Sequence, residues 1–298
     1  MSPGVYDELV KINKKNSIVL RTTGGLDGVT VNGFIVSRSH NVTIEGFVVD
    51  AGKTRKDGIM LEGGNSDIIL EANVVKNSVK NHSGIVVSGD NPRTRIVNNR
   101  VHSNSANGIH FKKAKGGPQY VVNNTIVHNG WNGVHVARKQ VIYLVNNILS
   151  FNGTSPGKKG GRHGYGVLLE GKRHSGEPEN ITLLHNLIVG NHGRETSDSS
   201  PDIGNYAQVV DGTDRGNLTT SGTEGDGVSV SPTAVFAAIF VSETPIDLHL
   251  QESSVAIDMG LDDYNPPDSE AGAVPMLDFE GEIRPSEEAV DVGADERP

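Results

Sequence analysis

The chain has 298 residues, a formal net charge of −9 and no cysteine. Disulfides, thiolate catalysis and thiolate metal sites are therefore excluded, and the acidic balance disfavours a nucleic-acid partner. The 37 glycines and the 5% of aromatic residues are typical of an all-β protein with many tight corners. No apolar run approaches the roughly 20 residues that a membrane span requires.

We expect residues 1–25 to form an N-terminal coil or cap, and residues 26–210 to form regular coils with a repeat of about 25 residues. Each repeat begins with a glycine that opens a short strand with alternating apolar residues. The glycines are Gly58, Gly84, Gly108, Gly133 and Gly166. A second strand in each repeat ends at an asparagine, and these are Asn73, Asn99, Asn124, Asn147 and Asn186. Strands so short and so spaced cannot form hairpins, so they must stack in parallel as a β-solenoid.

Asparagine suits the corners of such a solenoid. Its side chain tolerates a left-handed backbone, and its amide can bond to the same amide one coil away. A second asparagine series follows five residues after the first, at Asn104, Asn129, Asn152 and Asn191. We interpret both series as structural ladders and assign them no chemistry.

Alternation within each glycine-started strand predicts which side chains fill the core and which point outward. Ile109 and Phe111 are predicted to be buried, as are their counterparts in the other coils. The outward positions hold His110 and Lys112 in one coil and His135 in the next, so the two histidines should lie in one column about 4.8 Å apart.

A cationic patch is predicted around these histidines. Arg138 and Lys139 follow the His135 strand, and Trp131 precedes it. The longest insertion between coils, residues 153–165, should overhang the patch with further cationic and aromatic side chains. Those in our candidate site are Arg162, His163 and Tyr165.

Residues 211–298 are expected to form irregular C-terminal coils and a cap, all within a single domain. Aspartates recur in its closing part at positions 258, 262, 263, 278, 291 and 295. We prefer a capping role for these carboxylates, through turns and hydrogen bonds, with calcium binding as an alternative.

The glycine-strand and asparagine-corner coils over roughly residues 26–210 resemble the right-handed parallel β-helix proteins of the pectate-lyase-like superfamily. DLHLQESSVAIDMG, DFEGEIRP and VDVGADE are similar to the closing segment of secreted bacterial β-helix proteins of the choice-of-anchor type. The resemblance implies a secreted, periplasmic or cell-surface bacterial protein whose signal peptide has been removed. It also implies that any chemistry sits on the outer face of the glycine-started sheet.

A cationic patch with aromatic rims suits a uronic-acid polysaccharide, because cations neutralise carboxylates and rings stack on sugars. For β-elimination we consider Lys112 or a histidine as the base and Arg138 or Arg162 as the neutraliser of the uronate. His135 or Tyr165 would be the acid. His110, His163, Trp131, Lys139 and Glu170 complete the candidate site.

Two further functions stay open at this point. A glycoside hydrolase needs two carboxylates on one face, but Glu62 and Glu170 are separated by three intervening coils in this alignment. Asp57, Glu62 and Asp90 could instead bind calcium, although the sequence requires no cofactor. The third class is a non-catalytic β-helix that binds glycan or serves as a surface spacer.

Overall fold

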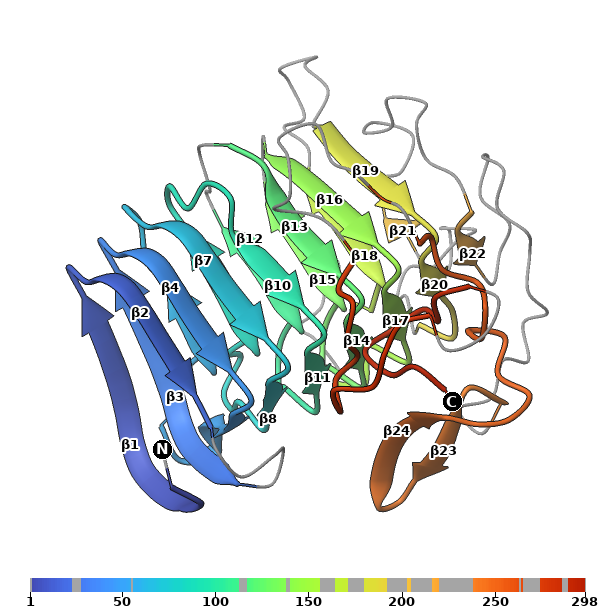
Figure 1. Cartoon of the computed structure of the whole chain (residues 1–298), viewed down its shortest axis with the longest axis horizontal. Helices are drawn as coiled ribbons and strands as arrows, with labels where there is room; N and C mark the ends of the chain where they lie inside the picture. Colours follow the sequence, from blue (N-terminus) through green and yellow to red (C-terminus); the bar gives the residue numbers. More distant parts are fainter. Residues whose placement is uncertain are drawn as a thin grey trace.

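Each coil of the chain contributes up to three short strands, which pair in parallel with the equivalent strands of the neighbouring coils (Figure 1). The computed structural model describes residues 2–22, 28–54, 56–112, 117–137, 140–155, 164–170, 180–191, 203–204, 216–219, 238–262, 264, 274–285 and 289–297. Equivalent corner residues such as Asn99 and Asn124 are 25 positions apart. This arrangement confirms the predicted parallel β-solenoid.

The strands form three faces. The first face contains the glycine-started strands β6 (Ile59–Leu61), β9 (Ile85–Ser88), β12 (Ile109–Lys112), β15 (Val134–Ala137) and β18 (Val167–Glu170), together with β21 (Ile203–Gly204). The second face contains β2 (Asn16–Arg21), β4 (His40–Glu45), β7 (Ser66–Glu71), β10 (Arg95–Val97), β13 (Gln119–Val122), β16 (Val141–Val145) and β19 (Asn180–Leu184). The third face contains β5 (Val48–Asp50), β8 (Val74–Lys76), β11 (Arg100–His102), β14 (Thr125–Val127), β17 (Ile148–Ser150), β20 (Leu187–Ile188) and β22 (Leu218–Thr219).

The N-terminal strands add to one end of this stack. β1 (Gly4–Asn13) pairs in parallel with β3 (Val29–Ser37), and β2 pairs with β4. β3 is long enough to pair with both β5 and β6, so it joins the first and third faces into one hydrogen-bonded sheet. A short 3₁₀ turn (Ala51–Lys53) follows β5.

The interior is filled by the alternating apolar positions that the sequence predicted. Ile109, Phe111, Val134 and Val136 are fully buried in one continuous core cluster. Removing such a side chain from water contributes about 1.5–3 kcal/mol, so columns of them across the coils supply much of the stability.

Both predicted asparagine ladders are present. The Nδ2 group of Asn99 donates to Oδ1 of Asn124 at 3.0 Å, and Asn124 donates in turn to Asn147 at 3.0 Å. The second ladder has the same geometry, with Asn104 donating to Asn129 at 3.0 Å. The first ladder also continues to residue 217, one rung beyond the prediction.

The backbone reason given for the ladder asparagines is wrong. Positive φ angles occur one residue earlier, for example at Asn98 (54°) and Asn123 (52°), whereas Asn99 and Asn124 are not among the residues with positive φ. Position 99 therefore requires asparagine for the interlocking hydrogen bonds, and position 98 supplies the left-handed corner.

In its described residues, the closing segment (residues 238–297) lies along the side of the solenoid. It includes the antiparallel hairpin of β23 (Phe240–Glu243) and β24 (Ile246–Leu250), and its path runs beside β11, β14 and β17 (Figure 1). The sequence predicts a cap at the end of the helix, but the described residues of this segment cover the third face. No helix in the described part of the chain is long and apolar enough to cross a membrane.

The third face needs this cover because its outward positions are apolar. Val127, Ile148 and Leu187 point away from the core, and they form a second hydrophobic cluster with Phe240 and Leu250 of the closing segment. Strands that are apolar at both inward and outward positions, such as TIV and ILS, are typical of sheets buried on both sides.

Candidate functional site

Two histidines stack on the outer side of the first face. The register pairs His110 of β12 with His135 of β15, and it pairs Lys112 with Ala137. The imidazole centroids are 4.5 Å apart and the ring planes differ by 6°. The predicted histidine column is therefore present, with Lys112 exposed two residues farther along β12.

Apolar side chains lie on either side of the stacked pair. The register places Val86 before His110 and Leu168 after His135, and these two residues are 4% and 1% exposed. The Nε2 atoms of both histidines are buried as well. The pair is thus set in a partly desolvated strip, where a hydrogen bond or a charge acts more strongly than in water.

Lys112 extends the strip as a point of positive charge. Its register neighbours are Ser88 and Ala137, which carry no charge, and Glu170 follows Ala137 one coil later. The backbones of Lys112 and Glu170 are thus two strand spacings apart, about 9.6 Å. The pairing of β15 with β18 also confirms the predicted alignment of the two coils on either side of the insertion at residues 153–165.

Several predicted site residues cannot be placed against this strip. Arg138, Lys139, Arg162 and His163 lie outside the described residues, and so does the side chain of Glu170. Their assignment stays a prediction.

Tyr165 does not have the position that the sequence predicted. Its side chain is 2% exposed, and its backbone N–H donates to Oδ1 of Asn132 at 3.0 Å. Asn132 itself donates to Asn107, so Tyr165 continues a column of buried corner residues. In this structure its ring is not available to stack on a sugar or to act as an acid. Trp131 is half-buried, and its backbone N–H donates to Ala106 O at 2.9 Å.

The structure does not bring together the three carboxylates considered for calcium. Asp57 precedes β6 and accepts a hydrogen bond from the backbone N–H of Ser83 at 2.7 Å. Glu62 follows the same strand at its other end and is exposed, as is Asp90. Five residues of extended chain separate Asp57 from Glu62, about 16 Å, which is too far for one ion.

The sequence analysis missed a cluster at the junction between the third face and the closing segment. The Nη2 atom of Arg100, on β11, lies 2.5 Å from Oε1 of Glu280 and 3.3 Å from Oδ1 of Asp295. His249, on β24, lies between two carboxylates, with Nδ1 2.5 Å from Asp247 and Nε2 3.1 Å from Glu280. We call these five residues the junction cluster.

Burial and hydrogen bonding shift the pKa values of the acids and of the histidine in this cluster. Desolvation raises the pKa of Glu280 to about 7, and it outweighs the attraction of Arg100. Burial alone would lower the pKa of His249, but the hydrogen bond with Asp247 and the nearby carboxylates raise it overall. Desolvation also raises the pKa of Asp295.

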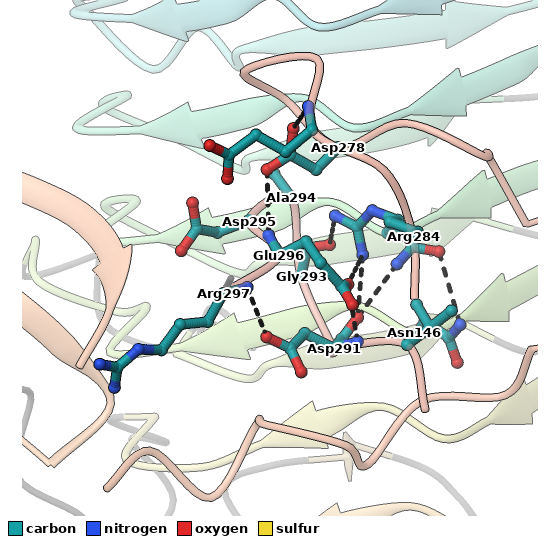
Figure 2. Close-up of polar contacts among 12 residues, drawn as sticks. Asn146, Asp278, Arg284, Asp291, Gly293, Ala294, Asp295, Glu296 and Arg297 are labelled. Atoms are coloured by element: carbon teal, nitrogen blue, oxygen red, sulfur yellow. Dashed lines mark hydrogen bonds and ion pairs between the residues drawn. The ribbon is translucent and has the colours of Figure 1, made fainter. Parts of the chain in front are cut away.

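Several other carboxylates of the closing segment accept backbone hydrogen bonds (Figure 2). Asp278 accepts from Glu282 N at 2.7 Å, and Glu296 accepts from Asp291 N at 2.9 Å. The buried guanidinium of Arg284 donates to Glu296 at 3.2 Å and to the carbonyl oxygen of Gly293 at 3.0 Å. These are the turn and hydrogen-bond roles that the sequence favoured for the recurring acids.

Comparison with known proteins places the fold. A family model described as "Right handed beta helix region" matches residues 32–223. The crystal structure of the pectate lyase Pel9A aligns with a TM-score of 0.50 at 17% identity, over 100% of this chain and 87% of that one. The periplasmic alginate epimerase AlgG aligns with a TM-score of 0.47 at 18% identity, over 65% of this chain and 45% of that one. No curated protein matches the chain.

At these identities the solved structures show the fold alone. The family match ends at residue 223, so the similarity of the closing segment to choice-of-anchor proteins stays a prediction. The match covers more than half of the 298 residues and supplies the right-handed sense of the coils. The chain belongs to the family of right-handed parallel β-helix proteins.

Proposed function

We propose that this protein binds an extended uronic-acid polysaccharide along the first face and cleaves it by β-elimination. The observation that carries the proposal is the His110–His135 stack with Lys112 beside it on a continuous parallel sheet. A sheet of this kind presents a long, nearly straight strip, which suits a chain of linked sugars. The likeness to Pel9A shows the fold alone, so the proposal depends on these side chains.

β-Elimination needs three contributions. A base takes the proton on the carbon beside the uronate carboxylate, a cation stabilises the resulting enolate, and the glycosidic oxygen leaves as a proton reaches it. Lys112 is exposed and can approach a bound sugar as the neutral base or as the cation. His110 and His135 each carry a ring nitrogen that can accept or donate a proton. We keep Arg138 and Arg162 as proposed neutralisers of the uronate.

Hydrolysis receives less support from the same face. An inverting or retaining pair needs two carboxyl groups about 5–9.5 Å apart across the bond that is cleaved. Among the described side chains of the first face, the outward column that passes through Glu62 continues with Ser88, Lys112 and Ala137, none of which is a carboxylate. An elimination, or binding without chemistry, fits this column better than hydrolysis.

The function is tested by incubating the protein with a panel of uronic-acid polysaccharides, with and without calcium. Rising ultraviolet absorbance reports the unsaturated uronate that elimination leaves, and a reducing-end assay reports any cleavage. We expect both signals for the wild type. His135→Ala and Lys112→Ala should each lose about 100-fold or more in rate, because a positioned acid or base contributes 10²–10⁴.

Other outcomes of these assays would assign the protein to another functional class. Reducing ends without absorbance would show a hydrolase, and silence in both assays would show a non-catalytic β-helix. The Lys112 side chain is exposed, so the thermal midpoint of Lys112→Ala should match that of the wild type. His135→Ala also loses the ring stack with His110, so its rate is compared at a temperature where thermal unfolding shows both proteins folded. Full activity in both variants would place the site elsewhere. Action on a polysaccharide would also agree with the exported location that we propose for the chain.

A further inference from the structure

The N-terminal end of the solenoid presents two open sheet edges (Figure 1). Among the described strands, β1 pairs only with β3, and β2 pairs only with β4. An unpaired strand directs a row of N–H and C=O groups at whatever lies beside it, and most proteins keep such edges very short. Here β1 has 10 residues and β2 has 6. This end of the solenoid is therefore a surface to which further strands can add.

The apolar core also reaches this end. Tyr6 and Val10 of β1 and Ile18 and Leu20 of β2 pack against the core, but they are only partly buried, because no described strand stacks on their open side. On the outer side of β2, Val19 is 62% exposed. Covering these side chains would remove apolar surface from water, which favours association.

The hydrogen bonds of the first coil show which residues face the open edges. The backbone N–H groups of Gly4 and Lys14 donate to carbonyl oxygens at the two ends of β3, so even-numbered residues of β1 bond toward β3. Thr22 N likewise donates to the carbonyl oxygen of Glu45 at the end of β4. Because successive residues of a strand bond to opposite sides, odd-numbered residues such as Leu9 and those of β2 face the open edges.

We propose that a second copy of this chain adds to the N-terminal end, so that β1 pairs antiparallel with β1 of the second copy and β2 with its own counterpart. Twofold symmetry makes each edge pair with itself, which places one residue of each strand on the axis. The first and third faces meet along β1 and β3, opposite the second face. One axis can thus pass through both β1 and β2, and the two solenoids then stand head to head.

Charge selects the register of the β1 pair. With Leu9 on the axis, Asp7 of each copy lies opposite Lys11 of the other copy, and the interface contains this ion pair twice. Glu8 then lies opposite Val10, so no like charges meet. With Asp7 or Lys11 on the axis, identical charges would face each other, which destabilises a strand pair. The edge is therefore complementary to itself in one register.

The side chains of this ion pair are available for the contact. Lys11 is exposed, and the side chain of Asp7 is 69% exposed. Asp7 already accepts hydrogen bonds from Asn32 at 2.7 Å and from Lys53 at 3.3 Å, and both use its Oδ1 atom. The Oδ2 atom can accept a further bond from Lys11 of the second copy.

On the second face, the axis passes through Val19. The exposed side chain of Val19 then contacts its own counterpart, and Ile18 lies opposite Leu20, which extends the apolar core across the interface. Arg21 brings no unpaired charge to this edge, because it lies 2.7 Å from Oε1 of Glu45 in its own chain. Both edges thus bring together groups that favour association.

The test is the mass of the full chain in solution, measured by light scattering after size-exclusion chromatography with any purification tag removed. We expect twice the mass of one chain at high concentration and dissociation on dilution. Val19→Glu places two carboxylates together on the axis, so its dissociation constant should rise at least about tenfold. The matched control is Val241→Glu, because Val241 is 56% exposed on β23, in the closing segment. This control should dimerise like the wild type, and circular dichroism verifies that both variants fold.

An introduced thiol gives an independent test, because the chain has no cysteine. Residues that pair directly in antiparallel strands have Cα atoms about 4.5–5.5 Å apart, within the range that a disulfide bridges. Under mild oxidation, Val19→Cys should therefore form a covalent dimer, whereas Val241→Cys should remain largely monomeric on a denaturing gel.

Three results would overturn the proposal. A wild type that stays monomeric at every concentration would leave this end to a different protein or to another segment of the chain. A dimer that Val19→Glu leaves intact, or that Val241→Glu weakens equally, would place the interface elsewhere. Equal crosslinking of the two cysteine variants would show random collision in place of a specific interface. None of these results depends on whether the first face acts on a polysaccharide.

Discussion

Glycine at the start of each first-face strand lets successive coils approach closely. A Cβ atom on Gly108 would lie 2.7 Å from the carbonyl oxygen of Gly133 and would also overlap the side chain of Ile126. Gly84 and Gly133 meet the same obstacle in the coils on either side. The repeating glycine is therefore required by packing between coils, because the obstructing atom belongs to the backbone and cannot move alone.

Gly108→Ala should lower the free energy of unfolding by about 1–3 kcal/mol, the usual cost of overpacking. Urea unfolding followed by circular dichroism measures the change. Gly117→Ala is the matched control, because its Cβ would meet only Pro92, at an ordinary 3.5 Å. The control should be neutral or slightly stabilised, since alanine restricts the unfolded chain. Equal effects of both substitutions would contradict the packing explanation.

At the residue scale, the sequence predicted where side chains lie better than it predicted why each residue type is needed there. Alternation was enough to place His110 and His135 in one column, because neighbouring coils differ by one whole repeat. It could not reveal that Tyr165 is buried, since burial at a corner depends on the column formed by Asn107 and Asn132. Adjacent asparagines such as Asn98 and Asn99 likewise have different roles, which the sequence alone does not distinguish. Asn98 adopts the left-handed corner, and Asn99 forms the hydrogen bond to the next coil.

At the scale of the elements, the buried guanidinium of Arg284 stabilises the fold of the closing segment. The side chain of Arg284 is 0% exposed and donates to Asp291 O, Gly293 O and Glu296 (Figure 2). Glu296 is 1% exposed, so its charge is compensated by Arg284 and by the N–H group of Asp291 rather than by water. The turn at residues 291–296 depends on this pair.

Arg284→Met should destabilise the docked segment by about 3–5 kcal/mol, because it leaves the Glu296 carboxylate buried without its cation. Urea unfolding measures this loss, and binding of a hydrophobic dye reports any exposure of the apolar third face. Arg297→Met is the comparison, since Arg297 pairs with the exposed Glu252 at 3.3 Å and surface pairs are worth at most about 1 kcal/mol. Similar losses in both variants would show that burial of the pair is unimportant.

The elements of the solenoid were predictable because their signals are local and repeat. The closing segment was not, since its contacts join residues far apart in the sequence, such as Arg100 and Asp295. One local signal was present but was not used. The third-face strands TIV, ILS and LI are apolar at outward as well as inward positions, which indicates a covered face.

At the scale of the whole molecule, the first face, the third face and the interior have separate roles. The third face is covered by the closing segment, and the interior is filled by the core and the asparagine ladders. The first face presents the paired histidines and Lys112. Such a division lets the stacked coils fix the spacing of the site residues while the closing segment covers another side of the solenoid.

The central claim is that an anionic sugar chain binds the first face, and calorimetric titration of a uronic-acid oligosaccharide at low salt tests it most directly. The wild type should bind the uronic-acid oligosaccharide better than a neutral one of the same length, and added salt should weaken that binding. Lys112→Ala should bind roughly tenfold more weakly, the loss of one hydrogen bond between charged groups, whereas Glu45→Gln should match the wild type. Equal binding of anionic and neutral oligosaccharides, or an unchanged Lys112→Ala variant, would contradict the account.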